Sequence, residues 1–327
     1  MVLIFTNKED SHPTPVIQHF NSWGVPFFRF NTECLLTDYE FKWWAEGTNT
    51  DFYIKNTING CEVYGHEVTA IWDRRPIPPS KLPIVCDEEI EKTNLEEAHG
   101  FLSFLRYYLK DIFSIGSIVN DRYASSKMLQ TKIALESGFI VPKTMYSNTK
   151  SELETYFLHS NYLSVKPISV DSVFFDNQEY VFYVNKHTPE QIFTQPCDAF
   201  SQTVSCIQDY IEKEYELRIT VCCDDVIACR IDSQKQKSGE GKEDWRQGYD
   251  FGLEQKIVEI SDNLKSSCLS YLKKMGLNFG CFDIIVTPQE EFVFLECNPN
   301  GQWYWIELET GAPISEIIAK HLSLRRN

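Results

Sequence analysis

The sequence predicts an α/β protein with more than one packed unit. Its 327 residues suffice for two or three units, and a content of 43% hydrophobic and 14% aromatic residues is typical of a globular chain. Short β-like runs alternate with helical runs in the first third, and strands separated by helices follow. This alternation favours sheets covered by helices. We expect three α/β units, covering residues 1–119, 120–202 and 203–327.

Composition and charge exclude several classes of partner. The net charge of −16 argues against nucleic acid and against an anionic membrane. No apolar run approaches the ~20 residues of a membrane span, and the N-terminus lacks a signal-peptide core, so we expect a cytoplasmic protein. The eleven cysteines include no CxxC pair, which argues against a disulfide framework and a zinc site. An anionic substrate would need a local cluster of Arg and Lys.

The first unit is predicted to be a small domain with a largely parallel sheet. Strands are expected in VLIFT, VPFFRFN and VTAIWD, and a helix in PTPVIQHFNSW ends at Gly24. A long helix follows, with Thr93 and Glu96 as a possible capping box. Its apolar residues recur at three-and-four spacing from Leu95 to Ile112, the pattern of a buried helical face.

The second and third units alternate helices and strands. The second has one predicted helix through RYASSKMLQTKIALES, ending at Gly138, and strands in YLSVKPIS and EYVFYVN. The third has predicted strands in VSCIQDYI and ELRITVCCDDVIACRID. A long helix with apolar residues from Leu253 to Met275 ends at Gly276, a β-hairpin follows, and a helix that begins at Pro313 closes the chain.

The hairpin FDIIVTPQEEFVFLECNPN carries an acid in the middle of each apolar strand. If it turns at Gln289 and Glu290, Asp283 lies directly opposite Glu296, with Cβ atoms about 4.5–5.5 Å apart. Asn298 points to the same face. Opposed like charges destabilise a sheet, whereas three oxygen-bearing side chains bind a hard divalent cation. We therefore predict a Mg²⁺ site at these three residues.

Two other interpretations of the hairpin stay open. In one, an acid pairs with an arginine elsewhere in the chain. In the other, a one-residue slip in register turns the two acids to opposite faces. The polar Asn-Pro-Asn-Gly that follows the second strand favours the metal site, because it places the acids at an open end of the sheet.

Two lysines and one connector suit a nucleotide. Lys127 lies in the helix after NDRYAS, and Lys166 ends the apolar strand YLSV. A polar connector in IQDYIEKEYELRITV joins two strands, and the second carries Glu216 and Arg218 on one face. It offers backbone groups to a base, an acid to ribose hydroxyls and an arginine to phosphate. Taken alone, each lysine also fits a solvated surface position, and the connector fits an exposed crossover.

Together, in this order, these features resemble the ATP-grasp superfamily. The chain is most similar to graspetide ligases, the microviridin-type peptide macrocyclases, in AIWDRRP, NDRYASSKMLQTKIALESGFIVPKT, IQDYIEKEYELRITV, IDSQ with DWR, and FLECNPNGQW. The resemblance covers nearly the whole chain. It implies an α/β ATP-grasp fold with an N-terminal pre-ATP-grasp domain, a central domain and a C-terminal grasp domain. One departure is PISVDSVFFDNQEYVFY, which lacks the family's common glycine-rich loop over the phosphates.

The resemblance implies a role for each site residue. ATP contacts are implied for Lys127, Lys166, Gln208, Tyr210, Ile211 and Glu216, with Tyr210 and Ile211 acting through their backbone. Binding of phosphate, of a substrate carboxylate or of developing charge is implied for Arg218, Arg230 and Arg246. Mg²⁺ coordination is implied for Asp283, Glu296 and Asn298.

The implied activity is ligation of a ribosomally made precursor peptide. Asp or Glu side chains of the peptide would be activated as acyl phosphates and then joined to a side chain of the same peptide as esters or amides. The implied partner is a peptide with a leader and an acidic core, and the implied assembly is a homodimer. Arg74 and Arg75 in WDRRP either help to bind the acidic core or form an ion pair between domains.

Three other functions remain open. A RimK-like or glutathione-synthetase-like ligase would add a free amino acid to a carboxylate with the same ATP site. A regulatory nucleotide-binding module would keep the lysines and lose the metal ligands. A scaffold would leave the opposed acids without an explanation.

Overall fold

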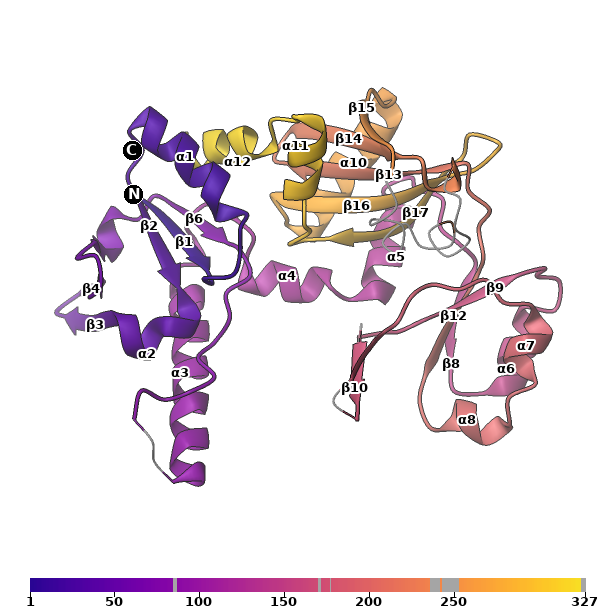
Figure 1. Cartoon of the computed structure of the whole chain (residues 1–327), viewed down its shortest axis with the longest axis horizontal. Helices are drawn as coiled ribbons and strands as arrows, with labels where there is room; N and C mark the ends of the chain where they lie inside the picture. Colours follow the sequence, from indigo (N-terminus) through magenta and orange to yellow (C-terminus); the bar gives the residue numbers. More distant parts are fainter. Residues whose placement is uncertain (85–86, 170–171, 177, 236–241, 243–252, 325–327) are drawn as a thin grey trace.

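The structure is a computed structural model that describes residues 1–84, 87–169, 172–176, 178–235, 242 and 253–324. Figure 1 shows the N-terminal domain at one end, the central unit at the other end, and the C-terminal sheet between them. Among the described helices, none combines the length and the apolar character needed to cross a membrane.

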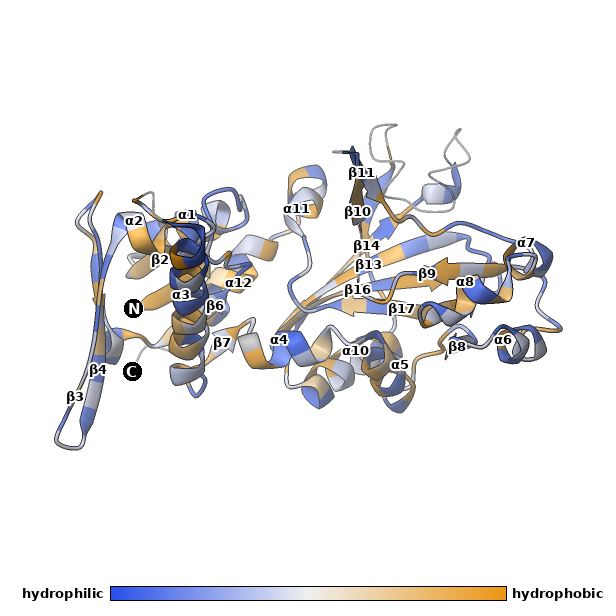
Figure 2. Ribbon diagram, turned by 90° about the horizontal axis from the view of Figure 1, so that it is seen from below, coloured by the Kyte–Doolittle hydropathy of each residue, from blue (hydrophilic) through white to orange (hydrophobic). Residues whose placement is uncertain are grey.

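The N-terminal domain contains the predicted parallel sheet, in the order β2-β1-β6-β7. Its strands are β1 (Val2–Thr6), β2 (Phe27–Asn31), β6 (Ala70–Asp73) and β7 (Ser114–Ile115). Helix α1 (Pro13–Trp23) covers one face and ends at Gly24, whose φ of 63° is left-handed, as predicted. Sequence analysis missed a second, antiparallel sheet made of β3 (Tyr39–Glu46), β4 (Asn49–Asn56) and β5 (Glu62–Tyr64). Figure 2 shows its β3–β4 hairpin projecting from the domain.

Helix α3 (Glu88–Tyr108) covers the other face of the parallel sheet. Its buried residues Ala98, Leu102 and Leu105 lie on the predicted face. The predicted capping box is wrong, because the helix begins five residues before Thr93 with Asp87 as its N-cap, accepting from the Glu89 amide. The Thr93 hydroxyl instead donates to the Glu89 carbonyl one turn back. The short elements between β2 and β6 are η1 (Thr32–Cys34), α2 (Leu35–Asp38) and η2 (Gly65–Glu67).

The central unit has a three-stranded antiparallel sheet in the order β8-β12-β9. The sheet consists of β8 (Thr144–Ser147), β9 (Leu163–Lys166) and β12 (Ser205–Asp209), and α6 (Lys150–Tyr156), α7 (Pro189–Phe193) and α8 (Cys197–Ser201) lie against it. A separate hairpin joins β10 (Ser172–Phe175) to β11 (Gln178–Val181). The single helix predicted before Gly138 is in fact two, α4 (Ile118–Ala124) and α5 (Lys127–Glu136), which are separated at Ser125 and Ser126.

The C-terminal unit is a five-stranded antiparallel sheet in the order β15-β14-β13-β16-β17. Its strands are β13 (Tyr215–Cys222), β14 (Asp225–Ile231), β15 (Gln255–Val258), β16 (Phe279–Val286) and β17 (Phe292–Asn298). The remaining elements are η3 (Ser233–Lys235), α10 (Asp262–Met275), α11 (Tyr304–Thr310) and α12 (Ile314–Ser323). Two predictions are corrected: ELRITVCCDDVIACRID forms two strands, and the long helix begins at Asp262 because residues 255–258 form an edge strand.

One face of the five-stranded sheet is covered, and the other face is covered at one end only. On one face, Ile219 and Phe282 pack with α5 and with Tyr271 of α10. At one end of the other face, α12 and Trp303 form a shared core with the N-terminal domain. The end of the chain therefore returns to α1, as Figure 1 shows. The opposite end of that second face stays open, and the candidate site lies there.

Candidate active site

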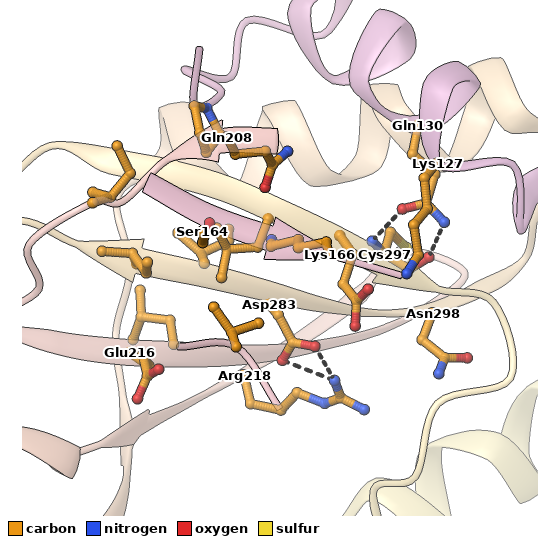
Figure 3. Close-up of a pocket in the computed structure, with 18 of the residues that line it drawn as sticks. Lys127, Gln130, Ser164, Lys166, Gln208, Glu216, Arg218, Asp283, Cys297 and Asn298 are labelled. Carbon is orange, nitrogen blue, oxygen red and sulfur yellow. Dashed lines mark hydrogen bonds and ion pairs between the residues drawn. The ribbon is translucent and has the colours of Figure 1, made fainter. Parts of the chain in front are cut away.

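A cavity of about 820 Å³ lies between the central sheet and the C-terminal sheet, in the size range of small-molecule sites. The structure brings ten of the twelve predicted site residues to its walls: Lys127, Lys166, Gln208, Tyr210, Ile211, Glu216, Arg218, Asp283, Glu296 and Asn298. Figure 3 shows seven of these side chains, labelled, around one space. They come from α5 and from strands of both sheets, so the site exists only when the two units are packed together.

The predicted pairing of Asp283 with Glu296 is confirmed, but the geometry behind it differs from the prediction. The hairpin has a three-residue loop, Pro288 to Glu290, with Glu290 in the left-handed region at φ 63°. Near the loop the register is therefore displaced by one residue from the predicted one. A β-bulge between Ile284 and Asp283 restores it, because Leu295 is an extra residue on β17. Without the bulge, Leu295 would oppose Asp283.

Asp283 is paired with an arginine, as one of the open interpretations proposed. Arg218 lies opposite it on β13 and donates from Nη1 to both carboxylate oxygens at 2.8 and 2.7 Å. Burial opposes the guanidinium charge, yet Asp283 and Glu296 outweigh it and raise the pKa of Arg218 above its usual range. Arg218 therefore stays cationic at the floor of the cavity, held where Figure 3 shows it beside Asp283.

The remaining predicted metal ligands lie next to this pair. Glu296 has no hydrogen-bond or ion-pair partner among the side chains of the described residues, although it faces Asp283. Asn298, two residues along β17, accepts from the Asn300 amide at 3.0 Å and keeps a second lone pair on the same oxygen. Two carboxylates and an amide oxygen around one acidic corner match the hard donors that Mg²⁺ prefers. The residues present thus fit the predicted ion.

A buried glutamine holds the strand that carries these ligands. Gln130 of α5 donates to the Cys297 carbonyl at 3.0 Å and accepts from the Cys297 amide at 3.1 Å. Strand β17 is an edge strand, so these bonds satisfy backbone groups that have no neighbouring strand. Because Cys297 lies between Glu296 and Asn298, Gln130 fixes the orientation of both.

The two lysines approach the cavity from different elements. Lys127 is the first residue of α5, and its ammonium group donates to the Pro167 carbonyl at 2.9 Å. Lys166 is the last residue of β9 and lines the same cavity. Two lysines from separate elements therefore line the same cavity, as an anionic ligand such as a triphosphate requires.

The connector between β12 and β13 lines the cavity as predicted, but one of its backbone amides is already bonded within the protein. The Tyr210 amide donates to the Tyr162 carbonyl at 2.9 Å, so this N–H cannot serve an adenine ring. Gln208 is buried and donates to the Thr144 hydroxyl at 2.9 Å. Glu216 is paired with Lys213, whose ammonium lies 2.5 Å from Oε1. The negative charge of Glu216 at the cavity is therefore balanced by the ammonium group of Lys213.

Two of the predicted arginines are not part of the described cavity wall. Arg230 pairs with Leu217 on β14, which places its side chain on the opposite face of the sheet from Glu216 and Arg218. There its guanidinium lies over the Tyr215 ring at 3.7 Å and donates to Asp232 at 2.8 Å. The predicted contact with phosphate is corrected for this residue. Arg246 lies outside the described residues.

Arg74 and Arg75, for which sequence analysis left open a contact with the acidic core or an ion pair between domains, lie in different surroundings. The ion pair of Arg74, with Asp10, lies within the N-terminal domain. Arg74 is 1% exposed, lies 3.2 Å from Asp10, and donates to the Asn300 carbonyl at 2.6 Å. Burial, opposed by Asp10, lowers its pKa to about 10. Arg74 therefore ties the N-terminal domain to the loop after β17. Arg75 lines the cavity, in a left-handed conformation at φ 48° with its carbonyl bonded to the Asn7 side chain at 2.8 Å.

The same loop contacts a buried acid of α4. Asn300 donates from Nδ2 to Asp121 at 2.6 Å and to the Asp73 carbonyl at 3.1 Å. The Asp73 carboxylate is itself bonded to Arg106, with both distances 2.7 Å. Burial and the nearby Asp73 charge raise the pKa of Asp121 to about 7. Asp73 of the N-terminal sheet and Asp121 of α4 therefore meet the loop after β17 at Asn300, two residues after Asn298.

Comparison with family models identifies both parts of the chain. A model of the MvdD pre-ATP-grasp domain matches residues 1–122, and a model of the RimK-like ATP-grasp domain matches residues 124–322. The second match covers more than half of the chain. This chain belongs to the RimK-like ATP-grasp family. The predicted α/β ATP-grasp fold with an N-terminal pre-ATP-grasp domain is confirmed.

Solved ATP-grasp structures resemble this family member over their full length. A RiPP-associated ATP-grasp ligase from Chryseobacterium gregarium, in complex with ADP and a leader and core peptide, has a TM-score of 0.91 at 24% identity, covering 100% of this chain and 97% of that chain. Macrocyclase MdnC from Microcystis aeruginosa MRC, bound with precursor peptide MdnA, has a TM-score of 0.83 at 26% identity and covers 98% of both chains. The comparison with curated proteins gave no match.

Sequence analysis of this ATP-grasp chain missed three residues that shape the site. Gln130 occupies the buried face of α5 beside Ile133 and Ala134, where a polar side chain signals a buried hydrogen bond. Lys213 precedes Glu216 by three residues. This spacing alone does not predict an ion pair, because the two side chains meet only through the geometry of the turn before β13. Asn300 belongs to the quoted NPNG, and only the packing of the N-terminal domain and α4 against this loop assigns it a contact.

Proposed function

We propose that this chain is an ADP-forming ligase that cross-links a ribosomally made precursor peptide. It would activate Asp or Glu side chains of the peptide as acyl phosphates and form intramolecular esters or amides. The observation that carries the proposal is the cavity, where two lysines, a buried arginine and the Asp283, Glu296 and Asn298 set line one space. The similarity to peptide-bound ligases over 97–98% of their lengths supports the peptide as substrate.

The proposed reaction has two steps, formation of an acyl phosphate and closure of the ring. A carboxylate oxygen of the peptide attacks the γ-phosphorus of ATP, the bond to the β–γ bridging oxygen breaks, and ADP leaves. A hydroxyl or amine of the same peptide then attacks the acyl carbon, loses its proton and expels inorganic phosphate. The peptide loses one water for each ring. Since the nucleophile is on the same molecule, positioning supplies much of the rate.

Each group in the cavity has a role in this proposal. Lys127 and Lys166 bind the phosphates, the connector from Gln208 to Glu216 binds adenosine, and Arg218 stabilises the charge on the transferring phosphoryl group. Asp283, Glu296 and Asn298 would hold Mg²⁺, which neutralises the negative charge of the phosphates. Arg246 stays a predicted ligand of the substrate carboxylate.

The proposed partner is a peptide with a leader and an acidic core. The chain itself has a net charge of −16, so an acidic core is repelled at long range and must be held by local cations. Arg75 is the described cation of the N-terminal domain that lines the cavity and suits this task. A homodimer remains a prediction from the resemblance to graspetide ligases.

The test uses peptides encoded by short reading frames beside the gene. Each is incubated with the purified chain, ATP and Mg²⁺, and its mass and the ADP formed are measured. We expect a loss of one water per ring, with about one ADP released for each water lost. A parallel reaction supplies free amino acids, each in turn, in place of the peptide.

The two ligase functions predict different products. An unmodified peptide mass, with ADP formed only when a free amino acid is present, would replace the cross-linking proposal with amino-acid addition. Peptide variants with each core Asp or Glu changed to Asn or Gln serve as controls, because they should lose one ring at a time.

A further inference from the structure

We propose that Cys222, Cys223 and His321 form a second metal site, for Zn²⁺ or a similar thiophilic divalent cation, away from the proposed ATP cavity. Cys222 ends β13, and Cys223 lies in the two-residue turn that leads to β14. Cys222 is four residues beyond Arg218 on the same strand, about 13 Å in an extended chain. The site is thus separate from the Asp283 and Glu296 corner.

The three ligand atoms are already close together. The Sγ atoms of Cys222 and Cys223 and one ring nitrogen of His321 all lie within 4.8 Å of one another. In tetrahedral zinc sites, ligand atoms bound at 2.0–2.3 Å lie roughly 3.3–3.8 Å apart, so only small side-chain movements are needed. Two thiols and an imidazole are soft or borderline donors, which favour Zn²⁺ over Mg²⁺.

The turn explains how adjacent cysteines reach one ion. Neighbouring residues of a regular strand point to opposite faces of the sheet. Cys223 instead has a left-handed φ of 55°, and its amide donates to the Asn278 carbonyl at 2.8 Å. A cysteine at a turn position that glycine or asparagine normally occupies keeps both sulfur atoms on the same side. Adjacent cysteines lack the CxxC spacing that usually indicates a zinc site, so the sequence predicted none.

His321 is oriented by an acid, as imidazole ligands usually are. Its Nε2 lies 2.7 Å from Asp225 and 3.6 Å from Asp224. A carboxylate that accepts from Nε2 fixes the ring and raises its basicity, and the ion would then bind Nδ1. The two acids also offset the charge of a bound dication.

The proposed ion would join elements that are far apart in the sequence. His321 lies on α12, which packs on α1 and shares a core with the N-terminal sheet. Cys222 and Cys223 lie at the end of the middle strand of the C-terminal sheet and in the turn that follows it. Metal binding would therefore stabilise the contact between the C-terminal helix and both domains, and a ligand that binds only the folded state raises the thermal midpoint.

The test is titration of the full, reduced, metal-free chain with Co²⁺, followed by displacement with Zn²⁺. We expect about one equivalent of Co²⁺ to produce a thiolate-to-cobalt charge-transfer absorption, and Zn²⁺ to abolish it and raise the thermal midpoint. Cys223→Ser and His321→Asn should weaken Co²⁺ binding at least about tenfold. Cys197→Ser, an exposed cysteine outside the cluster, should bind as the wild type does.

A further variant separates this site from the proposed Mg²⁺ site. Glu296→Gln should keep the charge-transfer absorption, because oxygen ligands do not produce it. The proposal is overturned if the folded wild type shows no such absorption, or if Cys223→Ser retains it in full. A purified chain whose two adjacent sulfurs are joined as a disulfide, and which binds no Co²⁺ after reduction, would also overturn it.

Discussion

At Asp283 the two neighbours across the sheet carry opposite charges, Arg218 on β13 and Glu296 on β17. The bonds from Arg218 make the first acid tolerable in an otherwise apolar strand. Glu296 receives no such bond from the described residues and raises the repulsion at this corner. The arginine and the metal interpretations of the hairpin are therefore compatible, because the arginine accounts for one acid and the proposed ion accounts for the other.

Removing one carboxylate tests whether Asp283 and Glu296 bind the proposed ion. Glu296→Gln should lower ligase turnover by more than about 100-fold, because even partners one step removed from a metal ligand cost 10–100-fold. Its free energy of unfolding should stay equal or increase, since the opposed charges are relieved. Steady-state ADP release and urea denaturation measure the two effects.

The control for this substitution lies in the same hairpin. Glu290→Gln removes an exposed acid from the loop and should leave turnover unchanged. Normal turnover in both Glu296→Gln and Asp283→Asn would contradict the assignment of these acids to a metal.

Gln130 offers a second prediction at the residue scale. Gln130→Met keeps the approximate size of the side chain but leaves the Cys297 amide and carbonyl without their partner. We expect a loss of about 1–3 kcal/mol in the free energy of unfolding, measured by urea denaturation. Lys132→Met, at an exposed position of the same helix, is the control and should change stability by less than about 0.5 kcal/mol. Equal stability of both variants would show that the strand edge does not need Gln130.

At the scale of elements, periodicity predicted strands and helices well where one face is buried. The α1 helix ending at Gly24 and the buried face of α3 follow directly from residue spacing. The prediction failed where two elements join without a strong breaker. Cys223 and Asp224 form a turn that contains no glycine, and Ser125 and Ser126 separate two helices that share one apolar pattern.

The register of the hairpin illustrates a second limit. The predicted pairing assumed a two-residue loop, whereas the loop has three residues and Leu295 forms a bulge. Both features move the register by one position, in opposite senses, so the acids still face each other. A bulge depends on packing on both faces of the strand, which residue spacing does not report.

At the scale of the whole molecule, the N-terminal sheet, α4 and the loop after β17 meet at Asn300 and at the buried Asp121. Ten of the predicted site residues line one cavity, as the resemblance to the ATP-grasp superfamily implied. The convergence of Arg74, Asn300 and Asp121 was not predictable, because each contact spans different domains.

The raised pKa of Asp121 predicts how stability depends on pH. Its pKa rises from 3.8 to about 7 on folding, through burial and the Asp73 charge. Between these values the folded chain holds a proton that the unfolded chain has lost, so stability falls as pH rises from about 4 to about 7. Asp121→Asn should remove this slope, as measured by urea denaturation across that range.

The charged and polar groups around Asp121 determine its pKa. Asp73, Arg106 and the Asn300 amide surround it, and Ser117 donates its backbone amide at 3.2 Å. Asp111→Asn, at an exposed position nearby in the sequence, should keep the wild-type slope. A slope that survives in Asp121→Asn would assign the effect to another group.

We propose that a peptide carboxylate attacks the γ-phosphate of ATP in this cavity. The direct measurement uses a precursor peptide with ¹⁸O in its Asp and Glu side-chain carboxylates and follows the label by mass spectrometry. Acyl phosphate formation predicts that each ring transfers about one labelled oxygen to inorganic phosphate. Rings formed with unlabelled phosphate, with the label lost to water, would contradict it.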